Sequence, residues 1–88
     1  MLNPVYEKRF KKEVEKARKR GKDMQKLTDI VTLLIEEKPL PAKNKNHKLK
    51  GDYSEYWECH VDPDWLLIYR IIKKDILFAR TGSHSDLF

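Results

Sequence analysis

Five side chains suited to acid–base or phosphate chemistry lie in loops or at the ends of expected strands: His47, His60, Asp64, Arg80 and His84. Histidine has an unperturbed pKa of about 6.5, so it can accept or donate a proton at neutral pH. Arginine can hold a phosphoryl oxygen through two hydrogen bonds. Histidine, carboxylate and arginine without a nucleophilic serine suit metal-free cleavage of RNA, in which the 2′-hydroxyl attacks phosphorus.

Each of these residues also has a plainer interpretation. A lone histidine is commonly an exposed or turn residue. Three histidines and an aspartate could bind zinc, but the chain has no His-x-x-x-His on an expected helix and no paired cysteines. Trp65, next to Asp64, suits either the core or stacking on a nucleobase. Cys59 lies on the apolar side of its segment, which favours a small core residue over a nucleophile.

Three segments are expected to form strands that bring these residues together. Residues 56–61, "YWECHV", alternate between an apolar and a polar side, residues 65–72, "WLLIYRII", are apolar on both sides, and residues 76–82, "ILFARTG", form the last strand. Simple alternation places Ile76, Phe78 and Arg80 on one side of that last strand. Paired as a meander, these strands would bring His60, Asp64, Arg80 and His84 to one edge of the sheet.

The first half of the chain is expected to hold two helices. Apolar residues recur at helical spacing over residues 6–20, Gly21 suits the end of that helix, and Asp23 suits the cap of a second helix over residues 24–38. Residues 40–56 are expected to be a loop that carries His47. A short N-terminal edge strand is possible, but Pro4 weakens it. We therefore expect one α+β domain over residues 1–88, a helical hairpin packed on a twisted, mainly antiparallel sheet.

The composition of the chain limits the kinds of partner that it is expected to bind. The 88-residue chain has a formal charge of +5, which favours a polyanionic or acidic partner. The lysines and arginines of the first helix would form either a solvated face or a track for phosphates. A single cysteine, no apolar leader and no apolar run long enough to cross a bilayer predict a soluble cytoplasmic protein without a membrane partner.

Three blocks of the sequence resemble YafQ-type toxins, which belong to the RelE/ParE superfamily of bacterial toxin–antitoxin systems. They are "HKLKG" at 47–51, "ECHVDPDWLLIYRI" at 58–71 and "RTGSHSDLF" at 80–88, and the helical half resembles the family as well. The resemblance implies a ribosome-dependent endoribonuclease that enters the ribosomal A site and cuts mRNA there. It also implies a cognate antitoxin, operator DNA bound only through the antitoxin complex, and no cofactor.

The resemblance assigns a role to each matching position. His84 would be the general acid, and Asp64, alone or with His60, the base. His47 and Arg80 would hold the scissile phosphate. Trp65 and Phe88 would shape the codon pocket. Pro4 departs from the family pattern, because it falls where the family usually has a strand.

Three other functions stay open on the sequence. The gyrase-directed branch of the same superfamily shares the fold but does not need this set of titratable groups. A non-catalytic RNA-binding or operator-binding module would depend on charge in the first helix rather than on His84. A free-standing ribonuclease would cut RNA without the ribosome.

Overall fold

A five-stranded sheet and three α-helices organise the chain, and the computed structural model describes all residues, 1–88. The elements in chain order are β1 (Asn3–Tyr6), α1 (Lys8–Lys19), α2 (Met24–Ile35), η1 (Ala42–Asn44, a 3₁₀ turn), β2 (His47–Lys48), η2 (Gly51–Tyr53, a second 3₁₀ turn), β3 (Trp57–Asp62), β4 (Trp65–Ile72), β5 (Asp75–Gly82) and α3 (His84–Leu87). The strand order is β1-β5-β4-β3-β2, with β1 parallel to β5 and every other pair antiparallel. The predicted α+β class and the mainly antiparallel sheet are confirmed.

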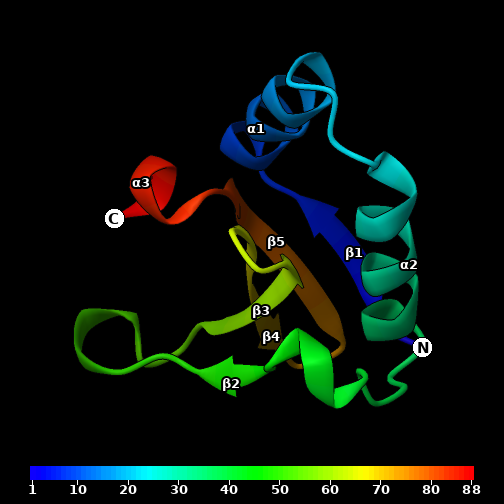
Figure 1. Ribbon diagram of the computed structural model, residues 1–88. Coiled ribbons are helices and arrows are strands. Elements are labelled where there is room, and N and C mark those ends of the chain that lie inside the picture. Colours follow the sequence, from blue (N-terminus) through cyan, green and yellow to red (C-terminus); the bar gives the residue numbers. More distant parts are fainter.

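The two long helices lie on a different side of the sheet from the short helix α3. In Figure 1, α2 runs along one side and α1 crosses one end, whereas α3 and the loop between β2 and β3 project on the opposite side. No helix has the length and apolar character needed to cross a bilayer.

The turn between α1 and α2 follows the local signals in the sequence. Gly21 has a φ of 79°, a left-handed conformation that suits glycine after a helix. The Asp23 carboxylate accepts a hydrogen bond from the Gln25 backbone N–H at 3.1 Å and so caps α2. Helix α2 ends at Ile35, earlier than predicted, because Glu37 adopts a left-handed φ of 59° before Pro39 is reached.

The N-terminal edge strand forms despite Pro4. The backbone N–H groups of Asn3 and Glu7 donate to carbonyls of Lys74 and Phe78, next to and within β5. Alternate residues of a strand point their N–H groups to opposite sides, so the nitrogen of Pro4 faces away from β5, where no donor is needed. The short N-terminal edge strand that the sequence left open is therefore present, over Asn3–Tyr6.

The core lies between the two long helices and one face of the sheet. Phe10 from α1 and Leu27, Ile30 and Leu34 from α2 pack in one buried cluster with residues of β3, β4 and β5. Cys59 belongs to that cluster and is fully buried, which confirms its predicted core role. Burial raises the pKa of its thiol to about 12, so the sulfur stays protonated and is no nucleophile.

A β-bulge in β5 decides which way Arg80 points. Ile68 pairs with Arg80 and the next residue, Tyr69, pairs with Phe78, so Ala79 has no partner in the register. Phe78 is fully buried in the core, and Arg80 is turned to the other face of the sheet. Simple alternation, which placed Phe78 and Arg80 on one side, is therefore wrong. The extra residue reverses the facing of the strand, as bulges beside functional sites commonly do.

Candidate active site

The sheet face opposite the core carries a row of polar side chains. The register pairs His47 with Glu58, Glu58 with Ile68, and Ile68 with Arg80, so these residues are cross-strand neighbours from β2 to β5. His60 lies two residues beyond Glu58 and therefore on the same face. We call this surface the polar face and define it by His47, Glu58, His60 and Arg80. His47 was expected in a loop, but it lies in the short strand β2.

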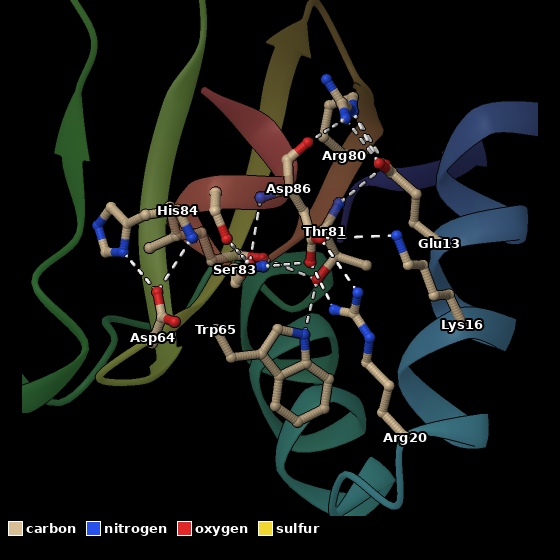
Figure 2. Close-up of polar contacts among 12 residues, drawn as sticks. Glu13, Lys16, Arg20, Asp64, Trp65, Arg80, Thr81, Ser83, His84 and Asp86 are labelled. Atoms are coloured by element: carbon tan, nitrogen blue, oxygen red, sulfur yellow. Dashed lines mark hydrogen bonds and ion pairs between the residues drawn. The ribbon is translucent and has the colours of Figure 1, made fainter.

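Asp64 and His84 are joined at the end of the polar face (Figure 2). Asp64 lies in the turn between β3 and β4, and His84 begins α3. One carboxylate oxygen, Oδ1, accepts hydrogen bonds from the His84 backbone N–H at 3.0 Å and from His84 Nδ1 at 2.7 Å. The backbone bond first, and then the side-chain bond, hold the pKa of Asp64 below its usual value. When Nδ1 donates to the carboxylate, Nε2 is left to face a substrate.

His60 brings a second imidazole beside this pair. The ring centroids of His60 and His84 are 5.9 Å apart. Of the five predicted catalytic residues, His60, Asp64 and His84 therefore converge. His47 and Arg80 lie further along the polar face, one on β2 and the other on β5.

Glu58 is the functional residue that the sequence analysis missed. Its Oε1 atom lies 3.5 Å from His47 Nε2 and 3.8 Å from His60 Nε2, and its side chain is only 10% exposed. The carboxylate makes no hydrogen bond within the chain and lies between two imidazoles. The signal for it was present, because Glu58 and His60 share the polar side of "YWECHV".

Arg80 is held by a carboxylate of α1. Its Nε and Nη2 atoms donate to the Glu13 carboxylate at 2.7–3.0 Å, and Glu13 also accepts from the Thr81 backbone N–H at 3.3 Å. The hydrogen bonds with Glu13 raise the pKa of Arg80. The third nitrogen, Nη1, has no partner within the chain and remains available to an anion (Figure 2).

The segment that carries His84 is clasped to α1 through Asp86. The Asp86 carboxylate accepts from Arg20 at 2.6 and 3.2 Å and lies 3.5 Å from Lys16 Nζ. It also accepts from the Ser83 backbone N–H at 2.9 Å, which completes a capping box at the start of α3. The Arg20 guanidinium, more than the Ser83 bond, lowers the pKa of Asp86 far below its usual range. Part of the basic face of α1 thus has a structural role that neither alternative for it had anticipated.

Trp65 belongs to the core rather than to the surface. Its side chain is 1% exposed, and its Nε1–H donates to Thr81 Oγ1 at 2.9 Å, which in turn donates to the Leu66 carbonyl at 2.7 Å. An indole buried in this way offers no face to a nucleobase. Of the two sequence interpretations of Trp65, core residue or stacking surface, the structure supports the core one, and its predicted part in shaping the codon pocket stays a prediction. Phe88 is 66% exposed and lies one turn beyond His84.

Two of the predicted catalytic residues lie in different hollows. One, of about 490 Å³, is lined by His60 and the other, of about 460 Å³, by Asp64, and neither is lined by the remaining three. The first lies between α2 and the segment around η1, and the second between α1 and the start of α3. No three of the histidine, cysteine, aspartate and glutamate side chains converge in a way that could hold a metal ion.

Comparison with known proteins places this chain in a protein family. The family model described as bacterial toxin of type II toxin-antitoxin system, YafQ, matches residues 2–88. The mRNA interferase toxin YafQ of Escherichia coli (strain K12) is 48% identical over 84 residues, which cover 94% of this chain and 91% of that protein.

Solved structures agree with the fold. The toxin in the crystal structure of the E. coli DinJ-YafQ complex superposes with a TM-score of 0.93 at 45% identity, covering 100% of this chain and 99% of that one. A metal-bound toxin from Helicobacter pylori superposes with a TM-score of 0.94 at 41% identity, with both chains fully covered. The sequence resemblance stated above is thereby confirmed.

Proposed function

The chain belongs to the YafQ family of bacterial toxins from type II toxin–antitoxin systems, and from this premise we propose that it is an endoribonuclease that cuts mRNA in the ribosomal A site and so stops translation. Its E. coli relative carries the name mRNA interferase toxin. The observation that carries the proposal is the His84–Asp64 pair with the His60 imidazole 5.9 Å from that of His84. Two imidazoles at this separation can serve the two oxygens on opposite sides of one phosphorus atom.

The reaction needs no external nucleophile. A base takes the proton of the 2′-hydroxyl, the 2′-oxygen bonds to phosphorus, and the bond from phosphorus to the 5′-oxygen breaks. His84 Nε2 gives its proton to that departing oxygen. The products are a 2′,3′-cyclic phosphate and a 5′-hydroxyl, and the enzyme regains its starting form when a proton passes from the base side to His84 through water.

The geometry favours His60 with Glu58 as the base in place of Asp64. Asp64 Oδ1 is already bonded to His84 twice, and each bond stabilises the ionised carboxylate and so makes it a weaker base. The Glu58 carboxylate lies 3.8 Å from His60 Nε2, where its charge would stabilise the imidazolium that His60 becomes when it takes the proton. Asp64 then acts on the acid: it orients the imidazole and stabilises its protonated form.

Cations on the polar face would bind the phosphate. Arg80 offers Nη1, and Glu13 holds the rest of its guanidinium in place. His47 is half exposed and lies at the other end of the row, 3.5 Å from Glu58. These donors would stabilise the charge that builds on the phosphoryl oxygens in the transition state.

The open shape of the site supports dependence on the ribosome. The five predicted catalytic side chains are not gathered in either of the hollows of about 490 and 460 Å³, so the chain alone gives a flexible RNA strand little to restrict it. A ribosome that holds the codon in place would form the missing wall of the site. It would also reduce the entropy that the RNA must lose to reach the reactive geometry. The charge of +5 suits a surface that must lie among rRNA phosphates.

The partner that restrains the toxin would be a separate antitoxin chain. The E. coli relative has been crystallised as the DinJ-YafQ complex. We extend this arrangement to the present chain in the cytoplasm, with operator DNA bound only by the toxin–antitoxin complex.

The test is cleavage of a defined mRNA with and without programmed ribosomes, by the wild type, His84→Gln and the remote control Lys74→Gln. Wild type and control should cut at the A-site codon only when ribosomes are present, and His84→Gln should lose roughly 10²–10⁴-fold in rate. Adding 1,10-phenanthroline, which removes transition metals but spares the Mg²⁺ that ribosomes need, should change nothing.

The other outcomes select other functions. Equal cutting of naked RNA would indicate a general ribonuclease. No cutting by a folded wild-type protein would favour the gyrase-directed or binding-module alternatives. Loss of cutting in phenanthroline would replace metal-free catalysis by a metal-dependent reaction.

A further inference from the structure

Tyr53 is an exposed aromatic residue that the core does not use. It ends the 3₁₀ turn η2 in the loop between β2 and β3, and it is 57% exposed. Tyr6 is also exposed, but its ring stacks on Phe10 and Phe78 and so belongs to the packing of α1 on the sheet.

The loop holds Tyr53 in a defined place. The Leu49 N–H donates to the Tyr56 carbonyl and the Tyr56 N–H to the Tyr53 carbonyl, both at 2.9 Å. The two tyrosine rings meet edge to face with centroids 6.3 Å apart. Arg70 lies over the Tyr56 ring at 5.8 Å and is 3.1 Å from Glu55. A ring braced in this way loses little further freedom when a ligand stacks on it.

The loop belongs to the same side of the sheet as the candidate site. Tyr56 directly precedes Trp57 of the core, so alternation places it on the face of Glu58, and Arg70 follows Ile68 on that face by the same rule. In Figure 1 the loop and α3 project from the same side of the sheet. Tyr53 and His84 therefore flank the polar face.

The chemistry around Tyr53 suits single-stranded nucleic acid. Lys50, just after β2, is exposed and takes part in no ion pair within the chain. Cations that follow a sugar–phosphate backbone beside an aromatic ring that stacks on a base are the common way of holding a single strand.

We propose that Tyr53, braced by Tyr56, is a stacking platform for a base of the mRNA adjacent to the cleaved phosphate, on the side of the polar face away from His84. This inference rests on the proposed function and adds a substrate-binding residue to it. The platform contributes to binding and to the choice of codon position, whereas proton transfer stays with the histidines.

The experiment uses programmed ribosomes whose mRNA has a 2′-deoxy sugar at the cleaved position and 2-aminopurine at one position at a time, in or next to the A-site codon. Stacking on tyrosine changes 2-aminopurine fluorescence. The variants are Tyr53→Phe, which keeps a ring, and Tyr53→Leu, which keeps an apolar side chain without one. Ile72→Ala, at the hairpin between β4 and β5, controls for the loss of an exposed apolar side chain on the same face.

The fluorescence of 2-aminopurine at one position of the mRNA should change when the wild type, Tyr53→Phe or Ile72→Ala binds. It should not change when Tyr53→Leu binds. On cleavable mRNA, Tyr53→Leu should raise KM roughly 10-fold and leave kcat nearly unchanged. Equal fluorescence responses from Tyr53→Leu and the wild type at every position would overturn the proposal.

A titration of the same RNA without ribosomes separates the two proposals. If the wild type fails to engage ribosomes but stacks on free RNA through Tyr53, the platform stands and ribosome dependence fails. If the wild type cuts at the A site and no position senses Tyr53, the proposed function stands and the platform is wrong.

Discussion

Asp64 Oδ1 lies 2.7 Å from His84 Nδ1 and 3.0 Å from the His84 backbone nitrogen, so one oxygen sets both the position and the ring orientation of the histidine. The two residues are 20 apart in sequence and belong to different elements. In the mechanism proposed above, this contact makes Asp64 the partner of the acid and leaves the base to His60 and Glu58.

Asp64→Asn should therefore lower kcat without weakening ribosome binding. The amide keeps the shape of the side chain but cannot stabilise a protonated imidazole, and we expect a loss of roughly 10- to 100-fold in kcat. Single-turnover cleavage on programmed ribosomes and a separate binding titration measure the two effects. Asp75→Asn, at the start of β5, is the control. An unchanged kcat would show that Asp64 does not act on His84.

Glu13→Gln should destabilise the fold and impair cleavage together. Glu13 and Arg80 are both largely buried, with side chains 16% and 20% exposed, so the change leaves a guanidinium without its counter-ion. The free energy of unfolding should fall by about 1–3 kcal/mol. Glu15→Gln, on the same helix but 59% exposed in its pair with Arg18, should change it by less than about 0.5 kcal/mol.

A double-mutant cycle separates this pair from other effects of the change. Urea unfolding of Glu13→Gln, Arg80→Gln and the double variant should give a coupling energy above about 1 kcal/mol. Additive single effects would mean that the two side chains do not interact in solution.

Acid should weaken the clasp between α3 and α1. The pKa of Asp86 is lowered in the folded chain from an ordinary value of 3.8, by Arg20 first and by the Ser83 backbone N–H. Its contribution to stability is therefore complete well above pH 3.8 and is lost as the pH falls below that value towards the folded-state pKa. The destabilisation caused by Asp86→Asn should be largest at pH 7 and shrink below pH 3.8.

Chemical denaturation of the wild type and Asp86→Asn at several pH values between 7 and about 2.5 measures this difference. Asp52→Asn, in η2 and without a hydrogen bond from its side chain, should show a constant small effect. A gap between wild type and Asp86→Asn that is independent of pH would contradict the role of the clasp.

Trp65→Phe should act on stability rather than on codon choice. The phenyl ring fills most of the indole space, but Thr81 Oγ1 loses the donor at 2.9 Å, and unfolding should become easier by about 1–3 kcal/mol. Cleavage positions on a long mRNA, mapped at a temperature where the variant is folded, should match the wild type. Altered positions would restore a direct role for the indole in the codon pocket.

Local sequence signals determined the elements of this protein. The glycine after α1, the Asp23 cap and the change of apolar period from helical spacing to alternation depend on interactions between neighbouring residues, so they can be read without the fold. They placed two helices before three strands and brought His60, Asp64 and His84 to one end of the sheet.

Only the tertiary structure decided how the site is completed. The bulge at Ala79 depends on pairing between β4 and β5, and it alone turns Arg80 away from Phe78. Glu58 gains its place between two histidines because β2 pairs with β3. Trp65 is buried because α1 and α2 cover its face. These contacts join residues far apart in sequence, and no pattern within a single segment records them.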